Sequence, residues 1–60
     1  MTHICEVFVT READFFVITI KGIGVTQAED VGEIELAAKD YAAAVLEVAE
    51  SDVEIRFVTS

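Results

Sequence analysis

Residues 22–50 constrain the fold of this 60-residue chain most, because they contain its one long run of helical spacing. The helix is predicted from Val31 to Glu50. Asp30 is a good N-cap, since its carboxylate can accept a hydrogen bond from an unpaired N–H of the first turn, and Glu33 follows at capping-box spacing. The segments before and after this stretch have the composition of strands, so a single helix is available to pack on the sheet.

The predicted helix has an apolar face and a polar face. Apolar side chains recur three or four positions apart and define the face expected to pack on the sheet, namely Val31, Ile34, Ala38, Tyr41, Ala42, Val45, Val48 and Ala49. The opposite face carries Glu33, Lys39, Asp40, Glu47 and Glu50. Leu36 breaks the pattern, because it projects among the acids of the polar face.

Strand-forming residues fill most of the remaining chain. The first strand is expected from about Thr2 to Thr10, the second over residues 15–20, a short third over 25–27 and the last over 53–59. Residues 1–60 are therefore predicted to form a single small α+β domain. It consists of a three- or four-stranded antiparallel sheet in the order β-β-β-α-β, with the helix packed across one face.

One helix leaves the other face of the sheet uncovered. Strand alternation places Ile4, Phe8, Phe15 and Val17 on that face. We expect this apolar face to form a homodimer or to meet another protein. The alternative is that the face assignment is wrong by one residue in one strand, which would exchange the two sets of side chains.

The charge of the chain restricts the class of partner. Twelve acids against four bases give a net charge of −8. Nucleic acids and anionic membrane surfaces are bound by Lys and Arg, so neither is expected as a direct partner. An acidic surface favours a basic protein partner. The alternative is that the acids only keep a small chain soluble in which 53% of the residues are apolar.

The sequence contains no targeting or membrane-spanning signal. It has no apolar run of 18 residues and no basic segment before an apolar stretch at its start. The single cysteine, Cys5, cannot form an internal disulfide. We therefore expect a cytoplasmic protein.

No set of residues predicts catalysis. His3 is the only histidine and has no nucleophile or second ligand near it in sequence, and Cys5 lies within an apolar strand. Asp30, Glu33 and Asp40 do not share one helix face, whereas a hard cation needs several converging oxygens. We expect no catalytic residue, no cofactor, no metal site and no enzyme activity.

Several short motifs resemble the N-terminal domain of HicB-type antitoxins. Gly24-Val25-Thr26-Gln27 matches the family's Gly and Thr-Gln segment, and Ala28-Glu29-Asp30 replaces its Gly-Asp-Thr. Val31 and Glu33 match an apolar and an acidic position, and Ala38-Lys39-Asp40 matches a later helical triplet. The chain lacks the family's proline before the glycine, and Gly32 stands where an acid is common.

The resemblance implies a module that binds and neutralises a small basic RNA-cleaving toxin. Family members often continue into a DNA-binding segment, whereas this chain stops at Ser60, so operator binding is not expected.

Three hypotheses follow for the function. The first is a non-enzymatic, HicB-like module that binds and inhibits a basic protein, as a dimer. The second is a small acidic self-assembling or phage-type inhibitory protein, whose apolar sheet face makes a homodimer and whose acidic surface meets a host protein. An enzyme is the third. The residues expected at a partner or self-interface are Ile4, Phe8, Phe15, Val17, Leu36, Glu33, Asp40 and Glu47.

Overall fold

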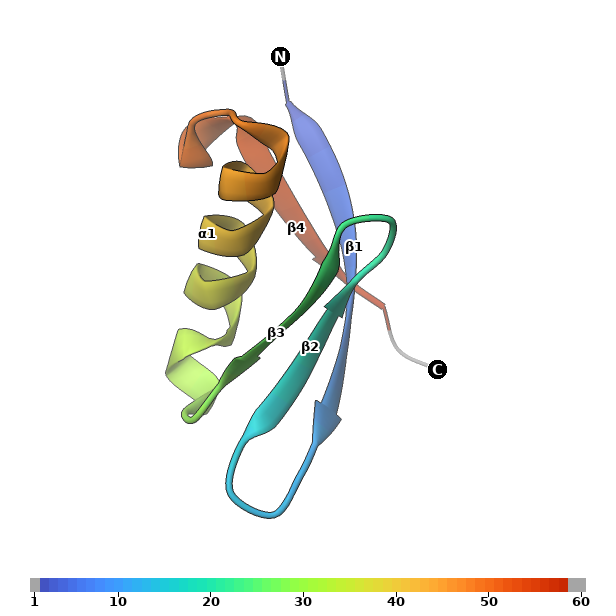
Figure 1. The fold of residues 1–60 in the computed structure, drawn as a ribbon, viewed down its shortest axis with the longest axis vertical. Helices are drawn as coiled ribbons and strands as arrows, with labels where there is room; N and C mark the ends of the chain where they lie inside the picture. The colour runs from blue at the N-terminus through green and yellow to red at the C-terminus, as the bar shows by residue number, and fades with distance from the viewer. Residues whose placement is uncertain (1, 59–60) are drawn as a thin grey trace.

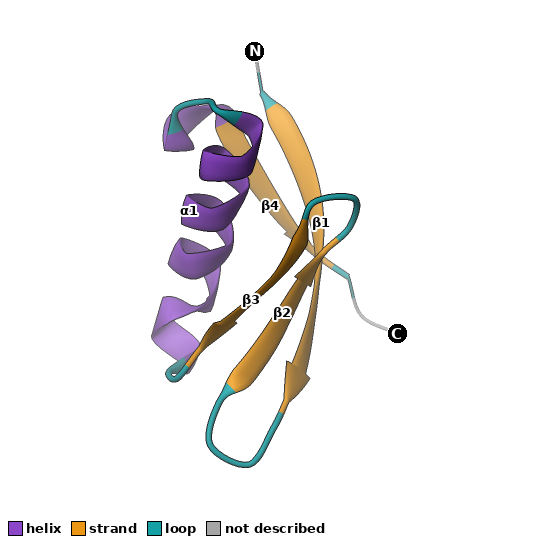
Figure 2. Cartoon of the chain, in the orientation of Figure 1, coloured by secondary structure: helices purple, strands orange, loops and turns teal. Residues whose placement is uncertain are grey.

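The computed structural model describes residues 2–58 and contains one sheet and one helix in two layers (Figure 1). The strands are β1 (His3–Arg11), β2 (Phe16–Ile20), β3 (Gly24–Ala28) and β4 (Val53–Phe57), and the helix is α1 (Ile34–Leu46). Short 3-10 turns, η1 (Val31–Glu33) and η2 (Glu50–Asp52), stand before and after α1. The α+β class, the order β-β-β-α-β and the helix across one face are confirmed (Figure 2).

The sheet is mixed rather than wholly antiparallel. Its strand order is β3-β2-β1-β4, with antiparallel pairing from β3 through β2 to β1. β4 pairs in parallel with β1, so that His3 lies opposite Val53 and Val7 opposite Phe57. The antiparallel prediction is wrong for this last strand. Because α1 carries the chain back along the sheet before β4 begins, β4 runs in the same direction as β3 and β1.

The core lies between α1 and one face of the sheet. The buried apolar residues are Cys5, Val7, Ile18, Ile20, Ala28 and Val53 from the sheet, with Ile34, Ala38, Ala42 and Ala43 from the helix. Ala38 and Ala42 have no exposed surface, so small side chains fill the centre of the helix–sheet contact. No helix within residues 2–58 is long and apolar enough to cross a membrane.

The strand register confirms the predicted faces of β1 and β2. Val7 pairs with Ile20, and both are buried under the helix. Phe8 pairs with Thr19 and points to the other face, where 38% of its surface is exposed. A register shift of one residue would reverse this arrangement, so that alternative is excluded for this pair of strands.

The helix is shorter than predicted at both ends. Asp30 is the N-cap of the 3-10 turn η1, with Oδ1 accepting from the Gly32 N–H at 3.4 Å, whereas α1 begins only at Ile34. The 3-10 turn leaves Val31 67% exposed. At the other end, the Val48 N–H donates to the Ala43 carbonyl, so the chain folds back over Ala43. Val45 remains 49% exposed. Ala49, beyond the end of α1, is exposed as well, so Val31, Val45 and Ala49 are wrong as predicted core residues.

Glu47 ends the helix in an unfavourable conformation. Its backbone has φ 58° and ψ 47°, the left-handed region that glycine occupies at many helix ends. Its carboxylate also lies at the negative end of the helix dipole. Glu47→Gly should therefore stabilise the fold by about 1 kcal/mol and raise the melting temperature by roughly 4–8 °C, measured by circular dichroism.

The control for this change is Glu47→Ala, which removes the charge but keeps a Cβ in the left-handed region. It should recover only a few tenths of a kcal/mol. Equal melting temperatures for the two variants would contradict a backbone origin of the strain.

Tyr41 of the helix packs directly on Gly24 at the start of β3. A Cβ built on Gly24 would lie 2.5 Å from the Tyr41 Oη and 3.0 Å from its ring, and the Gly24 backbone has φ 154°. Gly24→Ala should therefore destabilise the fold by about 2–3 kcal/mol, because both the clash and the backbone strain must be accommodated.

Urea denaturation would measure this loss, with Gly32→Ala as the control. A Cβ on Gly32 meets nothing within 4 Å, so that variant should keep or slightly exceed the wild-type stability. If the two alanine variants were equally stable, the packing of Tyr41 on Gly24 would not constrain the fold.

Candidate functional site

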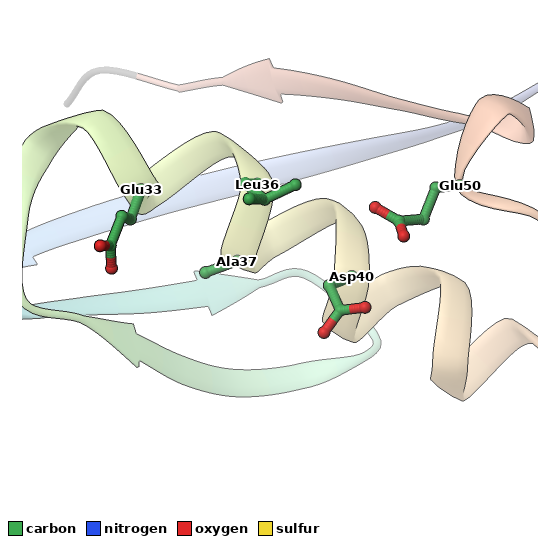
Figure 3. Close-up of a pocket in the computed structure, with 5 residues that line it drawn as sticks. All are labelled: Glu33, Leu36, Ala37, Asp40 and Glu50. Atoms are coloured by element: carbon green, nitrogen blue, oxygen red, sulfur yellow. The ribbon is translucent and has the colours of Figure 1, made fainter.

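A shallow hollow surrounds Leu36 on the outer side of α1. It has a volume of about 490 Å³ and is lined by Glu33, Leu36, Ala37, Asp40 and Glu50 (Figure 3). The Leu36 side chain is 64% exposed, although leucine is among the side chains most favoured by burial. We call this surface the Leu36 hollow.

Three local features of the fold build the Leu36 hollow. η1 brings Glu33 to the start of the helix, and Leu36 and Asp40 are four positions apart, on neighbouring turns of the same face. Ala37 forms the half-buried floor. Glu50 enters from η2, because the reversal at Glu47 turns the chain back (Figure 3).

The Leu36 hollow is strongly acidic. Its charged lining consists of the carboxylates of Glu33, Asp40 and Glu50. They belong to a larger acidic layer, residues 29–52, in which eight acids against the single base Lys39 give a net charge of 1 − 8 = −7. Lys39 lies on the other flank of Leu36, where it lines a smaller hollow with Gly32 and Glu35. The surface around Leu36 is therefore apolar at its centre and negative at its rim.

The carboxylates of the Leu36 hollow are arranged to meet several cationic side chains rather than one metal ion. Within residues 2–58, no three His, Cys, Asp or Glu side chains lie close enough together to hold one metal ion. The carboxylates of the Leu36 hollow are instead distributed around an apolar side chain (Figure 3). Lys or Arg side chains flanking an apolar residue would match both features, since a carboxylate accepts charge-assisted hydrogen bonds from either.

The structure divides the predicted interface residues between two surfaces. Glu33, Leu36 and Asp40 meet in the Leu36 hollow. Ile4, Phe8 and Val17 lie on the other side of the sheet, on the face away from the helix. Two further residues join neither group. Glu47 ends the helix outside the hollow, and Phe15 precedes β2 and lines a small hollow at the β1–β2 loop.

Sequence reasoning missed two features: the position of Glu50 in the Leu36 hollow and a second hollow. Glu50 was expected at the end of a longer helix, so its return to the Leu36 hollow depends on the reversal at Glu47. A second hollow, of about 440 Å³, opens where α1 starts too late to cover the end of the sheet. Its apolar lining includes Val9 and Phe57. Strand alternation places both on the face of the sheet that packs on the helix, but they remain 37% and 49% exposed.

The single histidine and the single cysteine of the sequence lie away from these two hollows. Cys5 is buried within β1, as predicted, and has 4% of its surface exposed. His3 is half-buried at the first position of the same strand. Neither residue lines the Leu36 hollow.

Comparison of the chain with family models, with curated proteins and with solved structures gives no match. The resemblance to HicB-type antitoxins therefore remains a prediction from the sequence.

The exposure of Leu36 has a consequence for stability. Leu36→Ala should change the free energy of unfolding by no more than about 0.5 kcal/mol, because the side chain contributes little to the core. Ile34→Ala, in the same helix but at a buried position, should cost about 2–4 kcal/mol.

Chemical denaturation of both variants would measure the difference. A large loss on truncating Leu36 would mean that it supports the fold, and would remove the reason to assign it to a binding surface.

Proposed function

We propose that this chain is a non-enzymatic protein-binding module that binds and inhibits a small basic protein through the Leu36 hollow. The sequence resemblance to HicB-type antitoxins supports an RNA-cleaving toxin as that partner. The observation that carries the proposal is an exposed leucine surrounded by three carboxylates and placed on a rigid helix.

The distribution of charge supports binding over mere solubility. Acids that served only to keep the chain in solution would be effective anywhere on the surface. Here residues 29–52 carry −7 of the total charge of −8. Such a one-sided field accelerates encounter with a basic partner and orients it toward the helix.

The apolar centre supports a specific contact. Charged groups at the rim of an interface mainly affect the association rate, whereas a central apolar anchor excluded from water contributes most of the affinity. Leu36 supplies such an anchor, and Ala37 leaves room beside it for a partner side chain. Binding that covers Leu36 would bring Glu33 and Asp40 against cationic groups of the partner.

The test uses the product of a neighbouring reading frame that encodes a short basic protein, purified and titrated by calorimetry. Asp40→Lys should weaken binding at least tenfold, because it places a cation inside the Leu36 hollow. Glu12→Lys is the matched control, since it changes the net charge equally in the β1–β2 loop, outside the hollow. That control should remain within about threefold of wild type, because its charge lies outside the contact.

Equal weakening by both variants would contradict the Leu36 hollow as the contact. Failure of every such basic protein to bind at micromolar concentration would contradict the function itself. Where the partner cleaves RNA, the wild-type chain should suppress the cleavage and Asp40→Lys should restore it.

A second candidate function, self-assembly, is favoured by a different surface. The face of the sheet opposite the helix carries exposed apolar side chains. A partner bound at the Leu36 hollow would not cover them.

A further inference from the structure

The sheet has an open face that α1 does not cover (Figure 2). Its apolar side chains come from three strands, with Ile4 and Val25 more than half exposed, Phe8 38% exposed and Val17 partly buried among them. Thr10, Thr19 and Gln27 complete the middle of this surface. We call it the open sheet face.

The open sheet face carries no net charge. Glu6 forms an ion pair with Lys21, with the Oε1 and Nζ atoms 3.5 Å apart, and lies opposite Arg56 in the sheet register. Glu54, opposite Ile4, is the remaining charged residue. Two acids and two bases therefore give 2 − 2 = 0 on this face. The rest of the chain holds the other ten acids and two bases, and so the whole net charge of −8.

We propose that a second copy of this chain covers the open sheet face. Two molecules of charge −8 repel each other most when their acidic layers approach, and least when their electrically balanced faces meet. A basic partner would instead be drawn to the acidic layer. In a dimer with a two-fold axis, the same surface of each copy forms the interface. The open sheet face, with its apolar centre and balanced charges, is suited to such a contact.

The size of the face predicts a weak dimer. Four strands about 4.8 Å apart and about six residues long at about 3.3 Å each span roughly 19 × 20 Å. This is on the order of 400 Å² per copy, about half of the 800 Å² per partner in a standard interface. The dimer should therefore form in the micromolar range and depend on concentration.

The dimer would present two binding surfaces. The Leu36 hollow is lined by residues of η1, α1 and η2. α1 lies on one side of the sheet (Figure 1), and the open sheet face is on the other. Two copies joined through their open faces would thus carry their hollows on opposite outer sides, and each could hold one basic partner. This consequence rests on the proposed function, whereas the dimer itself does not.

Sedimentation velocity from 1 μM to 1 mM, on the chain without any partner, tests the dimer. We expect Arg56→Glu to raise the dissociation constant at least tenfold, because it changes the open sheet face from neutral to −2. Lys39→Glu is the matched control, since it gives the same total charge of −10 but places the change on the helix. It should stay within about threefold of wild type.

Phe8→Thr provides an independent second variant, because it removes the central aromatic side chain without changing the charge and keeps a strand-forming residue. It should also weaken the dimer at least tenfold while circular dichroism remains that of the wild type. If Arg56→Glu did not fold, this variant alone would decide between the outcomes.

Three results would overturn the proposal. They are a wild-type monomer at 1 mM, equal weakening by Arg56→Glu and Lys39→Glu, and a dimer that persists in both Arg56→Glu and Phe8→Thr. The last result would place the contact elsewhere, for example at the free edge of β4. Because no partner is present, none of these results affects the test of the Leu36 hollow.

Discussion

A single helix can cover only one face of a four-stranded sheet, and the rest of this structure depends on that constraint. α1 spans 13 residues, about 20 Å at 1.5 Å per residue, which is close to the width of the sheet. The alanines at its centre allow a close contact but supply little apolar area. The buried core is therefore confined to the space between α1 and one face of the sheet. The apolar side chains on the opposite face of the sheet stay in contact with solvent.

Sequence patterns predicted much of this fold because burial follows alternation directly. The faces of β1 and β2 follow from a period of two, and the Asp30 cap follows from local hydrogen bonding. The antiparallel direction predicted for β4 was wrong, since a short alternating strand can pair in either direction. The end of α1 was missed because Glu47, a residue without glycine's freedom, adopts the left-handed conformation. The reversal is accompanied by a local hydrogen bond, from the Val48 N–H to the Ala43 carbonyl five residues earlier.

The candidate site was predictable only in part, because the chain reversal after α1 was not predicted. Leu36 stood out as an apolar residue among acids, and helical spacing placed it beside Glu33 and Asp40. The hollow also needs Glu50, which comes from beyond the helix and depends on the chain reversal. The balance of charge on the open sheet face was hidden as well. It requires Lys21, which follows β2 and is brought to this face by its ion pair with Glu6.

The two surfaces differ in physical character, and this difference would allow the two proposed contacts to form independently. The Leu36 hollow lies in a layer of charge −7, where attraction to a basic protein is long-ranged and weakened by salt. In the proposed dimer, contact through the neutral open sheet face would depend on apolar burial, and salt would strengthen it by screening the repulsion between two acidic bodies. A helix layer that collects the acids and a sheet face with balanced charges would thus separate the proposed attraction to a basic partner from the proposed association with a second copy. Because the sheet stands between them, a ligand on one surface leaves the other accessible.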